Sequence, residues 1–288
     1  MTSVTSKSKS SKLERNIFMD VITYVVLILV ALVSLFPIVW GLLTSLKPTS
    51  EIEQIPPMLF PSHVIFTNYF NVLFRSNFVT YFTNSIFITG LCVILSTIIA
   101  AHAAYAIARF KIRFKQQLMF GILMTSMVPT VALLIPLYII SVKAGLYNTR
   151  FLLILIYTAW RTPILTWILK GFFEKSPIEI EEAACVDGCT RTKIFYRMVL
   201  PVSQSGIASV ALLTSVYVWN DFLVQFSFTT KEDLRMISVG LYNYITQYGV
   251  QWGELMAAVI ISILPMVILF ICLQSKFVEG LAAGAVKG

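Results

Sequence analysis

Charged side chains are scarce in this sequence. Asp, Glu, Lys and Arg together make up 12% of the 288 residues, whereas 57% are hydrophobic and the mean hydropathy is +0.81. A soluble domain of this length carries about twice that charged fraction. No segment between the apolar runs is long enough to bury a core of its own. The composition therefore excludes a soluble domain and indicates a membrane protein.

Motifs of enzymes are also missing. The sequence contains no His-Glu-x-x-His zinc motif, no Gly-x-Ser-x-Gly nucleophile turn and no nucleotide-binding loop. Its four cysteines have neither disulfide nor metal-site spacing, because two lie in apolar runs while Cys185 and Cys189 are expected to face a reducing cytoplasm. We therefore predict that the chain is not an enzyme and has no catalytic residue, no bound metal and no cofactor of its own.

Long uncharged runs fill most of the chain. Five are long enough to cross about 30 Å of hydrocarbon at 1.5 Å per residue. They occupy 21–46, 76–108, 116–142, 198–220 and 255–275. A sixth apolar segment, 151–173, contains Arg161 and Lys170. We predict an all-α polytopic membrane protein with six transmembrane helices in 17–275, between terminal tails 1–16 and 276–288.

The basic residues predict how these helices are oriented. With the N-terminus inside, fifteen Lys and Arg residues fall on the inner side and six in the outer loops. Cytoplasmic loops carry such an excess, so both termini and the polar segment 174–203 are predicted to be cytoplasmic. The net charge of +8 follows mostly from this bias, so membrane lipid is an expected partner and nucleic acid is not. In the outer segment 227–254, residues 241–248 are expected to form a short interfacial helix.

The polar segment 174–203 has the signals of a helix, a turn and a second helix. Ser176 is expected to cap the first helix, with Pro177 at its first position and Glu179 completing a capping box. Gly188 can end this helix in a left-handed conformation. Thr190 can then cap a second helix, 191–199, which Pro201 is expected to stop.

This segment resembles the loop by which ABC importer permeases of the binding-protein-dependent type contact their ATPases. The family motif is Glu-Ala-Ala, three residues, Gly, nine residues, then Ile-x-Leu-Pro. It is matched by Glu182-Ala183-Ala184, Gly188 and Met198-Val199-Leu200-Pro201, with Met in place of Ile. The resemblance implies that ATPase coupling is carried by Glu181, Glu182, Ala183, Ala184, Asp187, Gly188, Leu200 and Pro201.

Other stretches extend the resemblance to the maltose-type carbohydrate permeases, in particular their six-span member. They are Ala104-Tyr105-Ala106-Ile107-Ala108-Arg109-Phe110, Gly145-Leu146-Tyr147-Asn148-Thr149, Trp219-Asn220-Asp221-Phe222 and the C-terminal tail. The resemblance implies the type I importer permease fold and a place in the bacterial cytoplasmic membrane. It also implies that the tail residues Gly284, Ala285, Val286, Lys287 and Gly288 contact the ATPases.

The partners implied by this resemblance are a second, non-identical permease, two ATP-binding-cassette ATPases and an extracytoplasmic solute-binding protein. ATP and Mg²⁺ would be bound by the ATPases rather than by this chain. The implied function is import of an oligosaccharide by alternating access. Two alternatives remain open: an ion-coupled secondary carrier, for which only Asp221 offers a carboxylate near the bilayer interior, and an ABC permease for a different small solute.

Arg161 is an unexpected charge in a predicted span. It lies about 15 Å into the helix, where placing Arg costs at least about 2.5 kcal/mol. One hypothesis is that Arg161, with Asn220 and Asp221, lines the translocation path and binds an acidic sugar such as a uronate. The alternative is internal pairing, either with carbonyls released by Pro163 or with Asp221.

Overall fold

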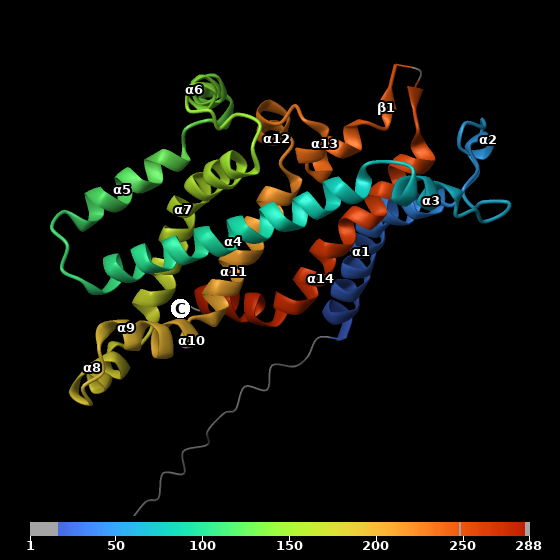
Figure 1. The fold of residues 1–288 in the computed structure, drawn as a ribbon. Coiled ribbons are helices and arrows are strands. Elements are labelled where there is room, and N and C mark those ends of the chain that lie inside the picture. The colour runs from blue at the N-terminus through green and yellow to red at the C-terminus, as the bar shows by residue number, and fades with distance from the viewer. Residues whose placement is uncertain (1–16, 248, 286–288) are drawn as a thin grey trace, which may run out of the picture.

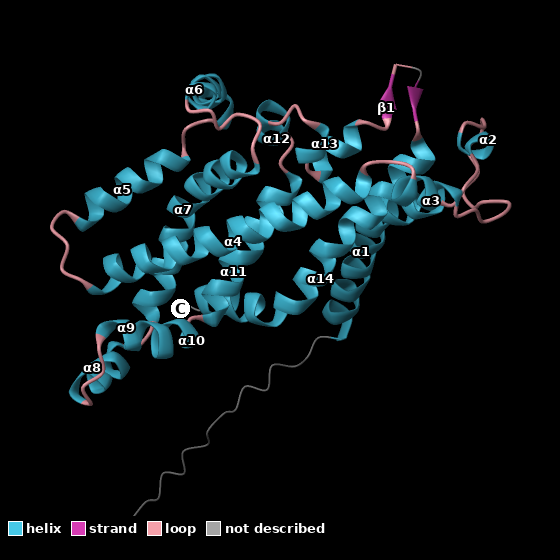
Figure 2. Cartoon of the chain, in the orientation of Figure 1, coloured by secondary structure: helices cyan, strands magenta, loops and turns pink. Residues whose placement is uncertain are grey.

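The computed structural model describes residues 17–247 and 249–285, and most of these residues are helical (Figure 2). The helices before the polar loop are α1 (Ile17–Ser45), α2 (Thr49–Ile52), α3 (Thr67–Phe74), α4 (Phe78–Arg109), α5 (Lys115–Ser126), α6 (Thr130–Lys143) and α7 (Arg150–Lys175). The loop and the remaining elements are α8 (Ile178–Val186), α9 (Arg191–Ile194), η1 (Phe195–Val199), α10 (Leu200–Val202), α11 (Gln204–Asn220), α12 (Leu223–Phe228), η2 (Glu232–Leu234), α13 (Ile237–Tyr242), β1 (Ile245–Thr246), β2 (Gly249–Val250) and α14 (Trp252–Ala285).

Four of the six predicted spans are single long apolar helices. They are Met19–Ser45, Phe78–Arg109, Arg150–Lys175 and Trp252–Val278. The other two are bent helix pairs, so six spans are present if each pair counts as one crossing. The predicted all-α class with up to six spans is therefore confirmed.

The third predicted span, 116–142, is not one straight helix. Helices α5 and α6 meet at an angle of 84°. The break falls at Met127–Pro129, and Pro129 has an extended-type ψ of 127°. A residue that precedes proline is disfavoured in the helical region, and proline cannot donate a backbone hydrogen bond, so Pro129 explains why the helix stops.

The fifth predicted span, 198–220, begins later than expected. Its helix α11 starts at Gln204, and the preceding segment Arg191–Val202 lies at 77° to it. Residues 198–202 therefore belong to the polar loop. The chain turns at Ser203, whose ψ of 23° lies outside the helical range.

The predicted interfacial helix at 241–248 is wrong. Helix α13 ends at Tyr242, and Ile245–Thr246 pair antiparallel with Gly249–Val250. The β-branched Ile245, Thr246 and Val250 favour strands, and Gly249 has a φ of +125° that no helix contains.

Figure 1 shows the long helices lying between two groups of short elements. One end of the molecule carries α8–α10, and the other carries α2, α3 and the β1–β2 hairpin. The core near α8–α10 is formed by apolar side chains of α4, α7, α8, α9 and η1, with Tyr105, Phe173 and Phe195 at its centre. This packing sets the position of the polar loop relative to the membrane helices.

Candidate functional site

Helix α8 ends in the conformation that the sequence predicts. Gly188 has a φ of +78°, in the left-handed region. The Cys189 N–H donates to the Ala184 carbonyl over 2.9 Å, and the Gly188 N–H donates to the Cys185 carbonyl over 3.1 Å. These two bonds form a Schellman motif, in which the residue at the left-handed position is usually glycine. The predicted turn at Gly188 is confirmed.

The predicted start of α8 is wrong in detail. The residue before its first helical position is Pro177, and no side chain caps this end. Ser176 instead ends α7, because its N–H donates to the Phe173 carbonyl. The hydroxyl therefore sits one residue too early to reach the free N–H groups of α8.

In the second half of the loop, the predicted helix cap at Thr190 is present, but the predicted helix end at Pro201 is not. The Thr190 hydroxyl accepts a hydrogen bond from the Lys193 N–H. Beyond Ile194 the helix widens into the π-turn η1, in which the Leu200 N–H donates to the Phe195 carbonyl, five residues back. The helix then continues through Pro201 to Val202. The wider turn shifts the register of the hydrogen bonds just before the proline, which explains why Pro201 does not end the helix.

The two faces of α8 differ in exposure. Glu182, Ala183, Asp187 and Gly188 are exposed, as is Pro201, and Leu200 is partly buried. Glu181 and Ala184 are buried, which fits their three-residue separation on one helical face. Exposed Ile178, Ile180 and Val186, which is 87% exposed, add apolar area to the outward face. The loop thus presents an apolar and acidic surface that no other described residue covers.

Glu181 binds the end of α4 rather than solvent. Its side chain is 2% exposed, and its Oε1 accepts from Arg109 Nε over 2.6 Å. The Tyr105 hydroxyl donates to Oε2 over 2.9 Å. Arg109 Nη2 also donates to the Ser176 carbonyl over 2.9 Å. The sequence placed Glu181 in the predicted coupling set but gave no signal of its bond to Arg109.

His102 lies on α4, one turn before Tyr105. Its Nδ1 lies 2.8 Å from the Ile98 carbonyl and its Nε2 lies 2.9 Å from the Tyr196 hydroxyl. The imidazole also packs on Phe195, at 4.9 Å between ring centroids. His102 therefore joins α4 to the π-turn of the loop.

Arg161 is partly buried in α7 and stacks on α11. Its guanidinium carbon lies 4.4 Å from the centre of the Tyr217 ring. Its buried Nε has no hydrogen-bond partner among the described residues. No described residue forms a salt bridge with Arg161, so the pairing with Asp221 considered from the sequence is not formed in this structure, where the Asp221 carboxylate binds the Tyr157 hydroxyl instead.

Asp221 has partners of its own. Its Oδ2 accepts from the Tyr157 hydroxyl over 2.7 Å and from the Val224 N–H over 3.0 Å, the second bond lying at the start of α12. Neighbouring Asn220 is exposed and donates to the Val216 carbonyl over 2.8 Å. Asn220 also lines a cavity of about 280 Å³ together with Trp219, Ser238, Ser262 and Met266. Asn220 therefore faces the cavity, whereas the Asp221 carboxylate is bound to Tyr157 and to the start of α12.

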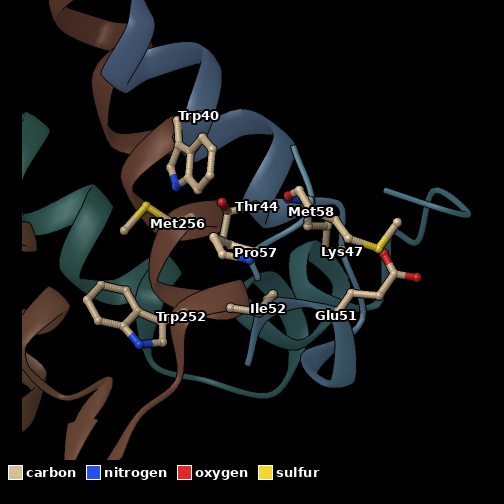
Figure 3. A pocket seen from close by; sticks show the side chains of 9 residues that line it. All are labelled: Trp40, Thr44, Lys47, Glu51, Ile52, Pro57, Met58, Trp252 and Met256. Carbon is tan, nitrogen blue, oxygen red and sulfur yellow. The ribbon is translucent and has the colours of Figure 1, made fainter. Parts of the chain in front are cut away.

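The end of the molecule that carries α2 and α3 holds a second cavity, of about 340 Å³ (Figure 3). Trp40 and Thr44 of α1 face Trp252 and Met256 of α14 across it. Buried Lys47 donates to the Met58 carbonyl and lies 5.3 Å from the centre of the Trp40 ring. Lys47 thereby attaches the Pro-rich loop after α1 to the end of that helix.

The tail residues predicted to contact ATPases lie mostly beyond the described part. Gly284 and Ala285 are in the last turn of α14, whereas Val286, Lys287 and Gly288 lie outside the described residues. Within residues 17–247 and 249–285, no group of three or more His, Cys, Asp or Glu side chains could hold a metal ion.

Comparisons with known proteins agree on one family. The model of the "binding-protein-dependent transport system inner membrane component" family matches residues 92–282. The chain is 34% identical over 254 residues to the sulfoquinovosyl glycerol transport system permease protein of Agrobacterium fabrum, covering 88% of this chain and 89% of that protein. It is 32% identical over 276 residues to the diacetylchitobiose uptake system permease protein of Streptomyces coelicolor, covering 96% and 100%.

A third relative and a solved structure extend the match. The trehalose/maltose transport system permease protein of Thermococcus litoralis is 34% identical, with coverage of 91% of this chain and 94% of that protein. A bacterial ABC transporter involved in the import of the acidic polysaccharide alginate contains a chain that superposes with a TM-score of 0.79. That chain is 23% identical, and the match covers 96% of this chain and 100% of that one, which establishes the type I permease fold. The chain therefore belongs to the binding-protein-dependent transport system inner membrane components, and it is a permease subunit of an ABC transporter rather than an enzyme.

Proposed function

We propose that this chain is one of two different permease subunits in an ATP-driven importer of oligosaccharides. The relatives named above are permeases for glycosides, chitobiose derivatives and trehalose or maltose, which supports a saccharide over another small solute. The partners would be a second, non-identical permease, two ATPases that bind ATP and Mg²⁺, and an extracytoplasmic solute-binding protein. Both termini and the α8–α10 loop would face the cytoplasm.

The observation that carries the coupling part of this proposal is the outward face of α8. Glu182 and Ala183 are exposed beside Val186, on a short helix at one end of the molecule. Alanine leaves the helix backbone open to close approach, and the apolar neighbours supply area to bury against a partner. Closure of the ATPase dimer would move this face, and the permease pair would change from inward-facing to outward-facing.

We further propose that the imported saccharide is acidic, and this part rests on Arg161. The alginate importer bears on the fold alone, because it is only 23% identical. Stacking on Tyr217 stabilises the guanidinium in part, yet the buried Nε keeps an unused donor. A carboxylate of the sugar would accept from Arg161 in a charge-assisted hydrogen bond, which is stronger than a neutral one.

The test is ATP-dependent uptake by the whole complex in vesicles, with neutral and uronate-containing oligosaccharides compared. Loss of a charged hydrogen bond is worth about 1.5–3 kcal/mol, so Arg161→Gln should lower uptake of the anionic sugar at least about tenfold. Uptake of a neutral sugar of equal length should change little. Arg161→Lys is the matched control that keeps the charge but loses the planar donor set.

Two results would contradict the acidic-sugar proposal. The first is an equal effect of Arg161→Gln on both sugars. The second is poor assembly of Arg161→Gln with partial rescue by Asp221→Asn, since this would assign Arg161 to an internal pairing in another conformation. Uptake driven by an ion gradient without ATP would overturn the wider proposal of an ATP-driven importer.

A further inference from the structure

A buried cluster fixes α8 to the inner end of α4. The carboxylate of Glu181 receives Arg109 Nε at 2.6 Å and the Tyr105 hydroxyl at 2.9 Å. Arg109 reaches a third element, because its Nη2 donates to the Ser176 carbonyl between α7 and α8. The Arg109 and Glu181 side chains are only 8% and 2% exposed. The pair therefore lies inside the chain and not on the surface offered to a partner.

Aromatic side chains surround this cluster and extend it to the second half of the loop. The Tyr105 ring lies 4.8 Å from Phe195 of η1 and 6.3 Å from Phe173 of α7, between centroids. His102, one turn before Tyr105 on α4, lies within hydrogen-bond distance of Tyr196. Both halves of the loop are thus attached to the last two turns of α4.

The opposite end of α4 is attached just as firmly to the outer segment 232–243. The Tyr81 hydroxyl donates to Glu232 Oε1 over 2.7 Å and accepts from Asn243 Nδ2 over 3.0 Å. Asn84 Nδ2 donates to the carbonyls of Asp233 and Arg235, over 2.8 and 3.0 Å. The hydroxyl of Ser85 accepts from the Ile237 N–H over 2.7 Å.

The contact between α4 and α13 is also close in van der Waals terms. A Cβ atom added at Gly240 would lie 2.2 Å from the Tyr81 ring. Only glycine allows this approach, so the outer segment is held against α4 by shape as well as by hydrogen bonds. A single 32-residue helix therefore connects α8 at one end with the 232–243 segment at the other (Figure 1).

We propose that α4 is a rigid rod between the two faces of the transporter, and that Arg109 and Glu181 are the positioning residues that hold α8 to it. Movement of α8 would then be transmitted to the outer segment 232–243 without rearrangement at the joint. This inference rests on the proposed docking of the α8–α10 loop to the ATPases. It assigns Glu181 a role inside the chain, distinct from the outward role of Glu182.

The physical reason is the cost of opening a buried ion pair. If α8 moved independently of α4, Arg109 and Glu181 would separate while remaining out of water, and each charge would lose its partner. Rotation of the two elements as one body avoids that loss. The Tyr105 hydrogen bond and the Ser176 carbonyl add geometric restraint, since they fix both oxygens of Glu181 and a second nitrogen of Arg109.

The first experiment measures the joint directly. The four native cysteines of this chain are first replaced by alanine or serine. Spin labels are then attached in the assembled complex at Phe110→Cys, directly after α4, and at Val186→Cys on the exposed face of α8. The label-to-label distance should be the same without nucleotide and with bound ATP. A label-to-label distance that changes on ATP binding would refute the proposal that α4 and α8 move as one body. This measurement does not depend on the folding of any Glu181 variant.

The second experiment measures coupling. Glu181→Gln should broaden the distribution of label-to-label distances. It should also reduce the stimulation of ATP hydrolysis by sugar-loaded binding protein about fivefold or more, the lower range for coupling between sites. Glu174→Gln is the matched control, because its exposed carboxylate pairs with Lys115 and Lys170 but not with α4. Unchanged stimulation and distance in Glu181→Gln would refute the positioning role. Failure of the docking proposal would give a different result: sugar uptake would stay normal when residues on the outward face of α8, such as Glu182, are substituted.

Discussion

Substitution of Gly188 by valine tests whether the turn after α8 is needed for transport. The φ of +78° at Gly188 is one that L-residues adopt at a cost of roughly 1–2 kcal/mol, and a β-branched side chain is at the high end of such costs. No atom lies within 4 Å of a Cβ added at this position, so the cost comes from the backbone and not from a clash. The variant therefore strains the turn and leaves the packing of the membrane helices unchanged.

The magnitude follows from the two hydrogen bonds that the turn holds. If the substituted valine leaves the left-handed region, the bonds from the N–H of Cys189 to Ala184 and from the N–H of position 188 to Cys185 are lost together. A strain of about 1.4 kcal/mol shifts the equilibrium between formed and frayed turn about tenfold. Thr190, which caps the next helix, would then move relative to α8, and the docking surface would lose its shape.

The assay is ATP-dependent uptake and sugar-stimulated ATP hydrolysis by the reconstituted complex. Gly188→Val should uncouple the two, with uptake falling by about an order of magnitude at normal complex yield. Gly188→Asn is the matched control, because asparagine tolerates the left-handed region. Normal uptake in the valine variant at normal yield would refute the docking of this loop, and equal defects in both variants would show that the backbone conformation is not the cause.

One further substitution and one truncation test the surfaces proposed to face partners. Glu182→Lys reverses an exposed charge on α8, so it should lower sugar-stimulated ATP hydrolysis while the chain still inserts into the membrane. Glu179→Lys, at another exposed position of the same helix, is its control. Equal effects of the two substitutions would argue against a specific contact at Glu182. Truncation after Phe277 should reduce ATPase activity of the complex without preventing membrane insertion, since all but the last residue of the span Trp252–Val278 is retained. Unchanged activity would remove the tail from the proposed ATPase contacts.

Hydropathy was sufficient to find the spans because each must cover the hydrocarbon with apolar side chains. It could not find the breaks at 127–129 and at Ser203, because the sequence stays uncharged across both. Pro129 was a visible signal for the first break. The break at Ser203 has no comparable proline signal. The nearest proline, Pro201, lies within a helix, because the preceding π-turn allows the helix to continue past it.

The functional loop was predictable in its turn and not in its orientation. Gly188 and Thr190 act locally, so their roles follow from residue type and spacing. The direction of Glu181 depends on which face of α8 is covered by α4, and adjacent residues on a helix point about 100° apart. The motif therefore placed Glu181 and Glu182 together, whereas packing separates them into a buried ion pair and an exposed carboxylate.

Arg161, inside the span α7, and Asp221, directly after α11, differ in a way that bears on the energy source. A carrier driven by protons or sodium needs a carboxylate that can exchange its partner during each cycle. Asp221 accepts from Tyr157 and also from the Val224 N–H at the start of α12, so releasing it would free a buried tyrosine hydroxyl and a helix end at once. Arg161 has the opposite character, because its charge is fixed and its Nε has no acceptor among the described residues. A fixed cation with an unused donor suits a site that binds an anionic group. It cannot release and rebind a coupling ion, so movement of such a site must be driven by another subunit. This favours ATP-driven transport over ion coupling.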